Sequence, residues 1–407
     1  MESNSGGRGM KETKFKPSLL QSIPEDWSDG TFGDFLTTFS SGATPYRGIP
    51  SNFVGKIPWI SSGELNYNRI TDTNEHISQE AQRNTHLTLH KTGTFLMAIT
   101  GLEAAGTRGR CAFIGTPATT NQSCLAINST DKMTVEYLFW FYRYWSDFLA
   151  FNYSQGSKQQ SFTAKIAKKL PIYAPKELQE QKAIAEALTD IDELIKGLDE
   201  WIAKKKAILE GTMQELLSGK RRLPGFSEPW KDMIISDVCE RYDNLRIPVS
   251  ANLREKGNIP YYGANGIQDF VSGYTHKGEF VLIAEDGANS IVNYPIRYVC
   301  GKIWVNNHAH VLQGKAGRLD TLFLSFILRT IDFASAIVGG SRNKLNATTL
   351  MTLSFKAPDS RKEQLSIASL LHDMDAEVEA LKNKREKYVA IRQGMIQQLL
   401  TGKIRLI

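Results

Sequence analysis

The amino-acid sequence contains one segment of 50 residues twice. Residues 174–223 align without a gap to residues 357–406 at a constant offset, and about 21 of the 50 aligned pairs are identical. The identical pairs include Glu180 with Glu363. Such a repeat indicates one structural unit that is used twice, and it constrains every fold that the chain can adopt.

Apolar residues recur in each copy at alternating steps of four and three. This spacing keeps one stripe of a helix facing one partner helix, as in a coiled coil. A single stripe indicates a dimerisation coiled coil or simple core packing as readily as it indicates an intramolecular pair, but two copies in one chain favour an antiparallel pair inside the molecule. At 1.5 Å per residue, about 40 helical residues give a rod of roughly 60 Å. The stripe comprises Ile184, Leu188, Ile191, Ile195 and Leu198 in the first copy and Ile367, Leu371, Met374, Val378 and Leu381 in the second.

Two globular segments that resemble each other only distantly accompany the helical repeats. Each opens on a tryptophan in an acidic stretch, Trp27 or Trp230, and each contains short apolar strands with glycine-rich turns. This pattern predicts an α+β fold with a pseudo-two-fold internal repeat, in which two α/β domains are separated by two long antiparallel coiled-coil helices. We expect an amino-terminal arm at 1–24, globular domains at 25–173 and 224–356, and helical repeats at 174–223 and 357–407.

The composition is that of an ordinary globular protein with a mildly basic balance. The formal net charge of +6 slightly favours a polyanionic partner such as nucleic acid. No run reaches the roughly 18 apolar residues of a membrane span, so we expect no membrane segment. The cysteines show no CxxC pair, which fits a reducing cytoplasm; they are Cys111, Cys124, Cys239 and Cys300.

The sequence lacks several common motifs of catalysis. It has no GxxxxGK[ST] loop, no GxGxxG after a strand, no Asn-Pro-Pro-aromatic tetrapeptide of amino-methyltransferases and no metal-type His/Cys spacing. Glu285 and Asp286 follow a predicted buried strand and could hold Mg²⁺, but the corresponding stretch of the first domain reads Ile99-Thr100, so a turn is the better interpretation. We expect neither catalytic residues nor a metal or cofactor in this chain.

Both globular domains end in a loop rich in side chains that can read base edges. Arg and Lys pair with guanine, and Asn and Gln pair with adenine. A second polar cluster follows the buried strand of each domain. For any single residue a solvated surface loop is the more common explanation, but the matched position of the loops favours contact with DNA. The candidates are Lys158, Gln159, Gln160, Arg108 and Arg110 in the first domain and Arg342, Asn343, Lys344, Asn289 and Ser290 in the second.

Two variable domains that alternate with two similar helical regions resemble the specificity subunit of type I restriction-modification enzymes. Each helical region is entered by Ala-Pro and Glu-Gln and closed by Gln-x-Leu-Leu-x-Gly-Lys. The resemblance implies a non-catalytic subunit whose two target-recognition domains each read one half of a bipartite double-stranded DNA target. It also implies two modification subunits that carry S-adenosylmethionine and the adenine methyltransferase site, and restriction subunits that translocate and cut with ATP and Mg²⁺.

Three other hypotheses fit parts of the sequence. The chain could serve a combined nuclease-methyltransferase partner, which the copurifying polypeptides would reveal. It could be a nuclease in itself that uses Glu285 and Asp286, in which case DNA cleavage with Mg²⁺ would be lost in Glu285→Ala. It could also be a coiled-coil scaffold with no role in DNA binding.

Overall fold

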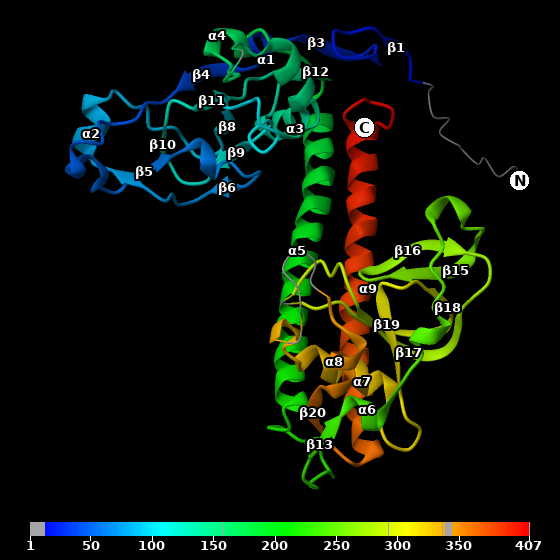
Figure 1. Ribbon diagram of the computed structural model, residues 1–407. Helices are drawn as coiled ribbons and strands as arrows, with labels where there is room; N and C mark the ends of the chain where they lie inside the picture. The colour runs from blue at the N-terminus through cyan, green and yellow to red at the C-terminus, as the bar shows by residue number, and fades with distance from the viewer. Residues whose placement is uncertain (1–12, 157, 292, 336, 338–343, 407) are drawn as a thin grey trace, which may run out of the picture. The chain divides into compact units, whose positions relative to one another are not determined.

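The computed structural model describes residues 13–156, 158–291, 293–335, 337 and 344–406. The chain divides into two compact units. Unit 1 consists of Met1–Gly197 with Arg385–Ile407, and unit 2 is Leu198–Lys384. Each unit contains one globular domain and parts of both long helices (Figure 1). No helix within the described residues is long and apolar enough to cross a membrane.

A five-stranded sheet forms the centre of the globular domain in unit 1. The strand order is β4-β11-β8-β9-β6, and all neighbours are antiparallel except β6 and β9. A second, three-stranded sheet of the same domain has the order β10-β5-β7. The strands are β4 (Thr37–Ser41), β5 (Ile57–Ile60), β6 (Arg69–Ile70), β7 (His76–Ile77), β8 (Phe95–Ala98), β9 (Cys111–Ile114), β10 (Thr119–Thr120) and β11 (Cys124–Asn128).

The apolar helix α3 (Val135–Tyr153) supplies much of the core of this domain. Phe95 of β8 packs edge-on against Tyr142, with ring centroids 6.0 Å apart, and Phe113 of β9 stacks on Phe139 at 5.0 Å. Such aromatic pairs add specific geometry to the burial of apolar surface. The sheet is therefore anchored on one side by a single long helix. The remaining elements are β1 (Phe15–Lys16), β2 (Ile23–Pro24), α1 (Phe32–Phe35), η1 (Pro50–Phe53), η2 (Ser62–Glu64), α2 (Gln79–Asn84) and α4 (Ala164–Ala167).

Unit 2 contains a six-stranded sheet with the order β14-β19-β17-β18-β15-β16. Its first five strands follow the same order as the sheet of unit 1, and here too one pair, β15 with β18, is parallel. The shared order confirms that the two globular domains are related. The strands are β14 (Cys239–Arg241), β15 (Lys256–Gly263), β16 (Gly266–Val271), β17 (His276–Ala284), β18 (Ile296–Val305) and β19 (Ala309–Gly314).

Short helices complete the second domain. Helix α7 (Thr321–Ile327) packs on β17, where α3 packs on β8 in the first domain. Its buried face includes Phe323 and Phe326. The other helices are α6 (Ile235–Val238), η3 (Asp243–Leu245), η4 (Ala251–Leu253), η5 (Leu328–Thr330), η6 (Phe333–Ser335) and α8 (Ala347–Thr352).

A two-stranded ribbon leads from each globular domain into its long helix. In unit 1, β3 (Trp27–Thr31) pairs with β12 (Pro171–Pro175), and in unit 2, β13 (Lys231–Ile234) pairs with β20 (Ser354–Ala357). The helices that follow are α5 (Leu178–Leu217) and α9 (Arg361–Leu399). Each domain therefore begins and ends at the foot of one helix.

The glutamine of the repeated Glu-Gln pair fastens each helix to its domain. The side chain of Gln181 donates to the carbonyl of Pro175 at 2.8 Å, and that of Gln364 donates to the carbonyl of Pro358 at 2.8 Å. Both glutamines are fully buried. Because a buried amide needs partners, this contact accounts for a glutamine at the same place in both repeats.

The two long helices pack together antiparallel, as the repeat predicts. In unit 1, Ile184 and Leu188 of α5 share a core with Leu399 of α9, and Arg392 of α9 pairs with Asp192 of α5. Figure 1 shows the two helices side by side. The contacts run in opposite directions along the two helices, because Leu399 of α9 shares a core with Ile184 and Leu188, whereas Arg392 pairs with Asp192 further along α5.

The same antiparallel arrangement holds in unit 2. Leu209 and Leu216 of α5 share a core with Ile367 and Leu371 of α9. Lys205, which interrupts the apolar stripe, forms an ion pair with Glu377 at 2.7 Å. Of the predicted stripe, Met374 and Leu381 are half-buried, and the other eight residues are buried. The stripe thus forms the seam of an intramolecular helix pair.

Candidate nucleic-acid interface

The two polar clusters predicted in the first domain meet in the structure. Thr100 and Ser161 form an isolated β-bridge, and the Leu102 amide donates to the carbonyl of Gln160 at 3.1 Å. The Gln160 amide in turn donates to the carboxylate of Glu103 at 2.8 Å. The loop after β8 and the loop before α4 therefore form one surface.

The corresponding loops of the second domain meet in the same way. Asp286 and Lys344 form an isolated β-bridge, and the Leu345 amide donates to the carbonyl of Glu285 at 2.8 Å. In the first domain, Phe162 donates to the carbonyl of Ile99 at 2.8 Å, which makes Ile99 the counterpart of Glu285. The candidates Arg342 and Asn343 lie outside the described residues.

Protein contacts already engage the two arginines predicted for the first domain. The guanidinium of Arg108 forms an ion pair with Asp147 at 3.3 Å, although without hydrogen-bond geometry, and lies 4.5 Å from the ring centre of Phe151. Arg110 donates to backbone carbonyls, including that of Gly63 at 3.4 Å. These contacts hold both side chains in place and reduce their freedom to reach a base.

Other candidates have exposed side chains. Lys158 and Gln159 are exposed in the first domain, whereas Gln160 is half-buried. In the second domain Asn289 is exposed and Ser290 is half-buried. Amide side chains such as those of Gln159 and Asn289 can form two hydrogen bonds with adenine.

Asn265 belongs to the surface of the second domain, and the sequence analysis overlooked it. It lies at the tip of the β15–β16 hairpin, where its side chain donates to the carbonyl of Gly287 at 2.9 Å and accepts from the amide of Asn289 at 3.0 Å. The dipeptide Asn265-Gly266 between two apolar runs is a typical hairpin signal and could have revealed the turn. The hairpin tip thus supports the polar loop 287–289.

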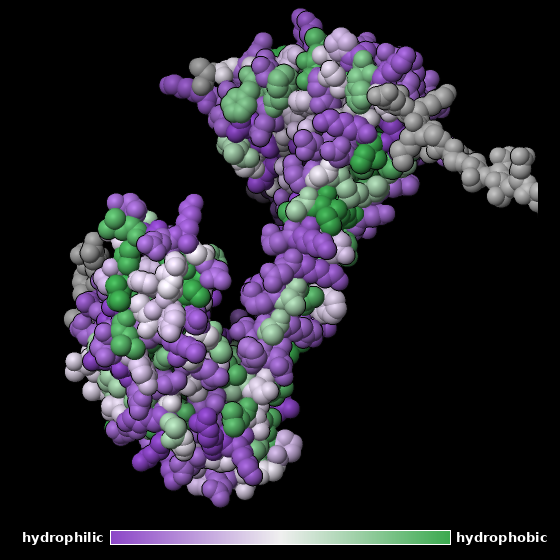
Figure 2. Space-filling view, turned by 90° about the vertical axis from the view of Figure 1, so that its right-hand side faces the viewer, coloured by the Kyte–Doolittle hydropathy of each residue, from purple (hydrophilic) through white to green (hydrophobic). Residues whose placement is uncertain are grey.

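The same hairpin and the segments before and after it carry exposed apolar side chains. Figure 2 looks at this side of unit 2 and shows hydrophobic residues among hydrophilic ones. Leu253 is 70% exposed, and the other apolar residues are about half exposed; they are Ile247, Ile267, Phe270 and Tyr274. No residue of this group was a candidate in the sequence analysis.

Asp243, Glu285 and His310 form the one group of described residues that could surround a metal ion. The ring nitrogens of His310 lie 2.7 Å from a carboxylate oxygen of Asp243 and 2.8 Å from the carbonyl of Leu345. Both of these oxygens are hydrogen-bond acceptors, so in this arrangement both ring nitrogens face protein partners. In this structure the group is joined by hydrogen bonds and short contacts within the protein.

Hydrogen bonds stabilise the ionised carboxylates of this network. Burial raises the pKa of Asp243, but bonds from His310 and the Val311 amide outweigh it, so the pKa lies below its usual value. Burial likewise acts on Glu285, whose pKa is nevertheless lowered by bonds from Arg246 and Lys344. Asp286 pairs with His308 at 2.6 Å. The carboxylates that the nuclease hypothesis would use for Mg²⁺ are therefore engaged by other side chains of the protein.

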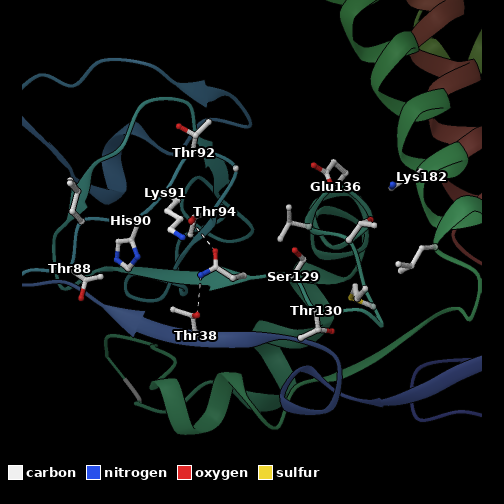
Figure 3. Close-up of a pocket in the computed structure, with 17 residues that line it drawn as sticks. Thr38, Thr88, His90, Lys91, Thr92, Thr94, Ser129, Thr130, Glu136 and Lys182 are labelled. Atoms are coloured by element: carbon white, nitrogen blue, oxygen red, sulfur yellow. Dashed lines mark hydrogen bonds between the residues drawn. The ribbon is translucent and has the colours of Figure 1, made fainter.

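A groove of about 730 Å³ lies at the other end of β8 in unit 1 (Figure 3). The segment before β8 lines one side with His90 and Lys91, and the start of α3 with Glu136 and the start of α5 with Lys182 line the other. Burial lowers the pKa of His90. None of the sequence candidates lines this groove.

The fold and the polar surfaces define a class of protein. Its members have two related α/β domains, each with a surface formed by two loops, and an intramolecular pair of repeated helices. The family model of the type I restriction modification DNA specificity domain matches this chain at residues 24–204 and 227–389. The chain belongs to this family. It is a specificity component, which is the non-catalytic part of such a system.

Individual relatives agree with this assignment. The chain is 45% identical over 139 residues to the putative type I restriction enzyme specificity subunit S.HindORF215P of Haemophilus influenzae, a match that covers 34% of this chain and 35% of that protein. It is 30% identical over 255 residues to the MjaIX specificity subunit of Methanocaldococcus jannaschii, which covers 61% of this chain and 55% of that protein. The chain thus matches between about a third and about a half of the length of these two relatives.

The fold also resembles a solved structure along nearly its whole length. The type I restriction-modification S subunit from M. genitalium superposes with a TM-score of 0.69 at 15% sequence identity and covers 92% of this chain and 96% of that one. At this identity the likeness concerns the fold, including two α/β domains and two long helices.

Proposed function

We propose that the chain reads a bipartite target on double-stranded DNA, one half with each globular domain. The observation that carries this proposal is the matched pair of loop surfaces. Residues 99–103 meet 160–162 in the first domain, and residues 285–286 meet 344–345 in the second. The position is shared, but the side chains differ, as is expected when two domains read different bases.

The helix pair would set the distance between the two half-targets. A continuous helix of 40 residues, such as α5, is about 60 Å long at 1.5 Å per residue. One turn of duplex DNA measures about 34–36 Å, so a helix of this length can separate two half-sites by more than a turn. Exposed lysines of the first domain, such as Lys165, would contact phosphates and add affinity without sequence information.

We further propose that the chain assembles with two modification subunits and with restriction subunits, and acts in the cytoplasm. Family membership supports this proposal. In such a complex the modification subunits would use S-adenosylmethionine, and the restriction subunits would use ATP and Mg²⁺. This chain would direct both activities to the target, and itself would require no cofactor.

Methylome sequencing tests the proposal. The full chain is expressed with its cognate modification subunits in a host that lacks other adenine methylation, and methylated adenines are mapped. We expect one motif with two specified halves and an unspecified spacer. Methylation without a bipartite motif, or DNA cleavage by the purified chain alone with Mg²⁺, would contradict it.

A further inference from the structure

Glu285 joins three segments of the second domain that are distant in sequence. It follows β17, and its side chain is 14% exposed. Its carboxylate accepts from Arg246 at 2.7 Å and lies 3.1 Å from the ammonium group of Lys344. Arg246 also donates to the carbonyl of Ala309 at 2.8 Å. The carboxylate thus ties the segment after η3 and the segment that begins at Lys344 to the end of the central strand.

The backbone of Glu285 reinforces this connection. Its amide donates to the carbonyl of His308 at 2.9 Å, and its carbonyl accepts from the amide of Leu345 at 2.8 Å. The loop that follows, with Gly287 and Asn289, is held in turn by Asn265. The placement of the loop 286–290 and of Lys344 therefore depends on residue 285 and its contacts.

Burial of an ionised carboxylate costs free energy of folding unless cations and hydrogen bonds compensate the charge. Here the compensation comes from Arg246 and Lys344, and His310 lies 3.8 Å away. At the two matching positions the first domain is uncharged, because its counterparts of Glu285 and His310 are the buried apolar residues Ile99 and Leu125. The second domain thus places two ionisable side chains where the first domain has apolar ones.

We propose that Glu285 is a positioning residue for target recognition by the second domain. This inference rests on the proposed function. Glu285 does not read bases itself. It holds Lys344 and, through its backbone, the loop 286–290 in the arrangement that reads one half of the target.

The test compares methylomes of the full chain and its variants, each expressed with the modification subunits. Glu285→Gln keeps the shape of the side chain but removes its charge. We expect the variant to lose base preference in one half of the motif by about tenfold or more, the loss of one good base contact, while the other half keeps its preference. A merely structural defect would instead lower methylation at both halves together.

Two further variants complete the experiment. Glu240→Gln removes an exposed carboxylate of β14 that bonds Tyr242, and it serves as the matched control with an unchanged motif. Lys344→Met removes the ammonium group but leaves the Glu285–Arg246 pair intact. It replaces Glu285→Gln as the test variant if Glu285→Gln does not fold. We expect it to relax the same half of the motif.

The outcomes separate this inference from the proposed function. If the wild type gives a bipartite motif and both halves stay unchanged in folded Glu285→Gln, the role of Glu285 is overturned and the proposed function stands. If Glu285→Gln does not fold, two unchanged halves in Lys344→Met have the same meaning. A wild type without any bipartite motif would overturn the proposed function. Relaxation of one half, with thermal unfolding close to that of the wild type, is the result that the inference requires.

Discussion

Arg405 and Glu180 form a bidentate ion pair, with the guanidinium nitrogens 2.6 and 2.8 Å from the carboxylate oxygens. The same relation recurs between their counterparts in the other repeat, Arg222 and Glu363, at 2.6 and 2.7 Å. Each arginine also lies over a tryptophan, Trp27 or Trp230, at the entry of a globular domain. The repeat therefore encodes contacts that each copy makes with the other.

Loss of one partner of this pair should destabilise unit 1. Glu180 is 2% exposed, so Arg405→Met would leave an uncompensated buried carboxylate. We expect a loss of about 3–5 kcal/mol in the free energy of unfolding, measured by urea denaturation. Arg221→Met is the matched control, because its exposed pair with Glu215 should contribute about 1 kcal/mol or less. Equal effects of the two variants would contradict this account of the repeat.

The charged network of the second domain should make unit 2 sensitive to acid. The pKa of Asp243 lies below its usual value of 3.8 in the folded chain. A lowered folded pKa means that its contribution is present above the usual value and is lost as the pH falls through the folded pKa. We expect Asp243→Asn to unfold more easily at pH 7 and to show a weaker loss of stability below about pH 4 than the wild type. Parallel stability curves for the two proteins from pH 7 to pH 2 would refute this prediction.

Two polar residues of the first domain should respond differently to truncation. Gln159 is exposed, so Gln159→Ala should leave the free energy of unfolding nearly unchanged and weaken one half of the motif by about 1–3 kcal/mol. Arg108 is held by Asp147 and Phe151, so the main effect of Arg108→Ala should be a lower free energy of unfolding rather than a changed motif. Methylome sequencing and thermal unfolding of both variants distinguish these effects. The assignment of Gln159 to base reading fails if its variant keeps the wild-type motif.

The helices were predictable from the sequence to within a few residues, and the globular domains were not. A heptad pattern such as Ile184 to Leu198 extends over several turns and indicates its own partner, because the chain contains the pattern twice. The strands of the domains have between two and ten residues, and β8 is buried on both faces, so its sequence carries no alternation that would fix the topology.

The state of individual site residues depends on contacts that local patterns do not contain. Arg108 is engaged by Asp147 and Phe151, which are about 40 residues away in the sequence. Glu285 was interpreted as part of a simple turn, yet it is bonded to Arg246 and Lys344. Such pairings arise from the tertiary fold, and only the structure shows them.

The central claim is that the helix pair fixes the spacer between two independently read half-targets. Seven residues inserted between Leu198 and Leu209 of α5 alone should disrupt the pairing with α9. Seven matched residues in both helices should preserve it and lengthen each helix by about 10 Å, which is roughly three base pairs.

The most direct measurement is the methylome of the full chain with matched seven-residue insertions in α5 and α9, expressed with its modification subunits. We predict that both halves of the motif are retained and that the unspecified spacer grows by about three base pairs. A methylated motif with the wild-type spacer would contradict the claim.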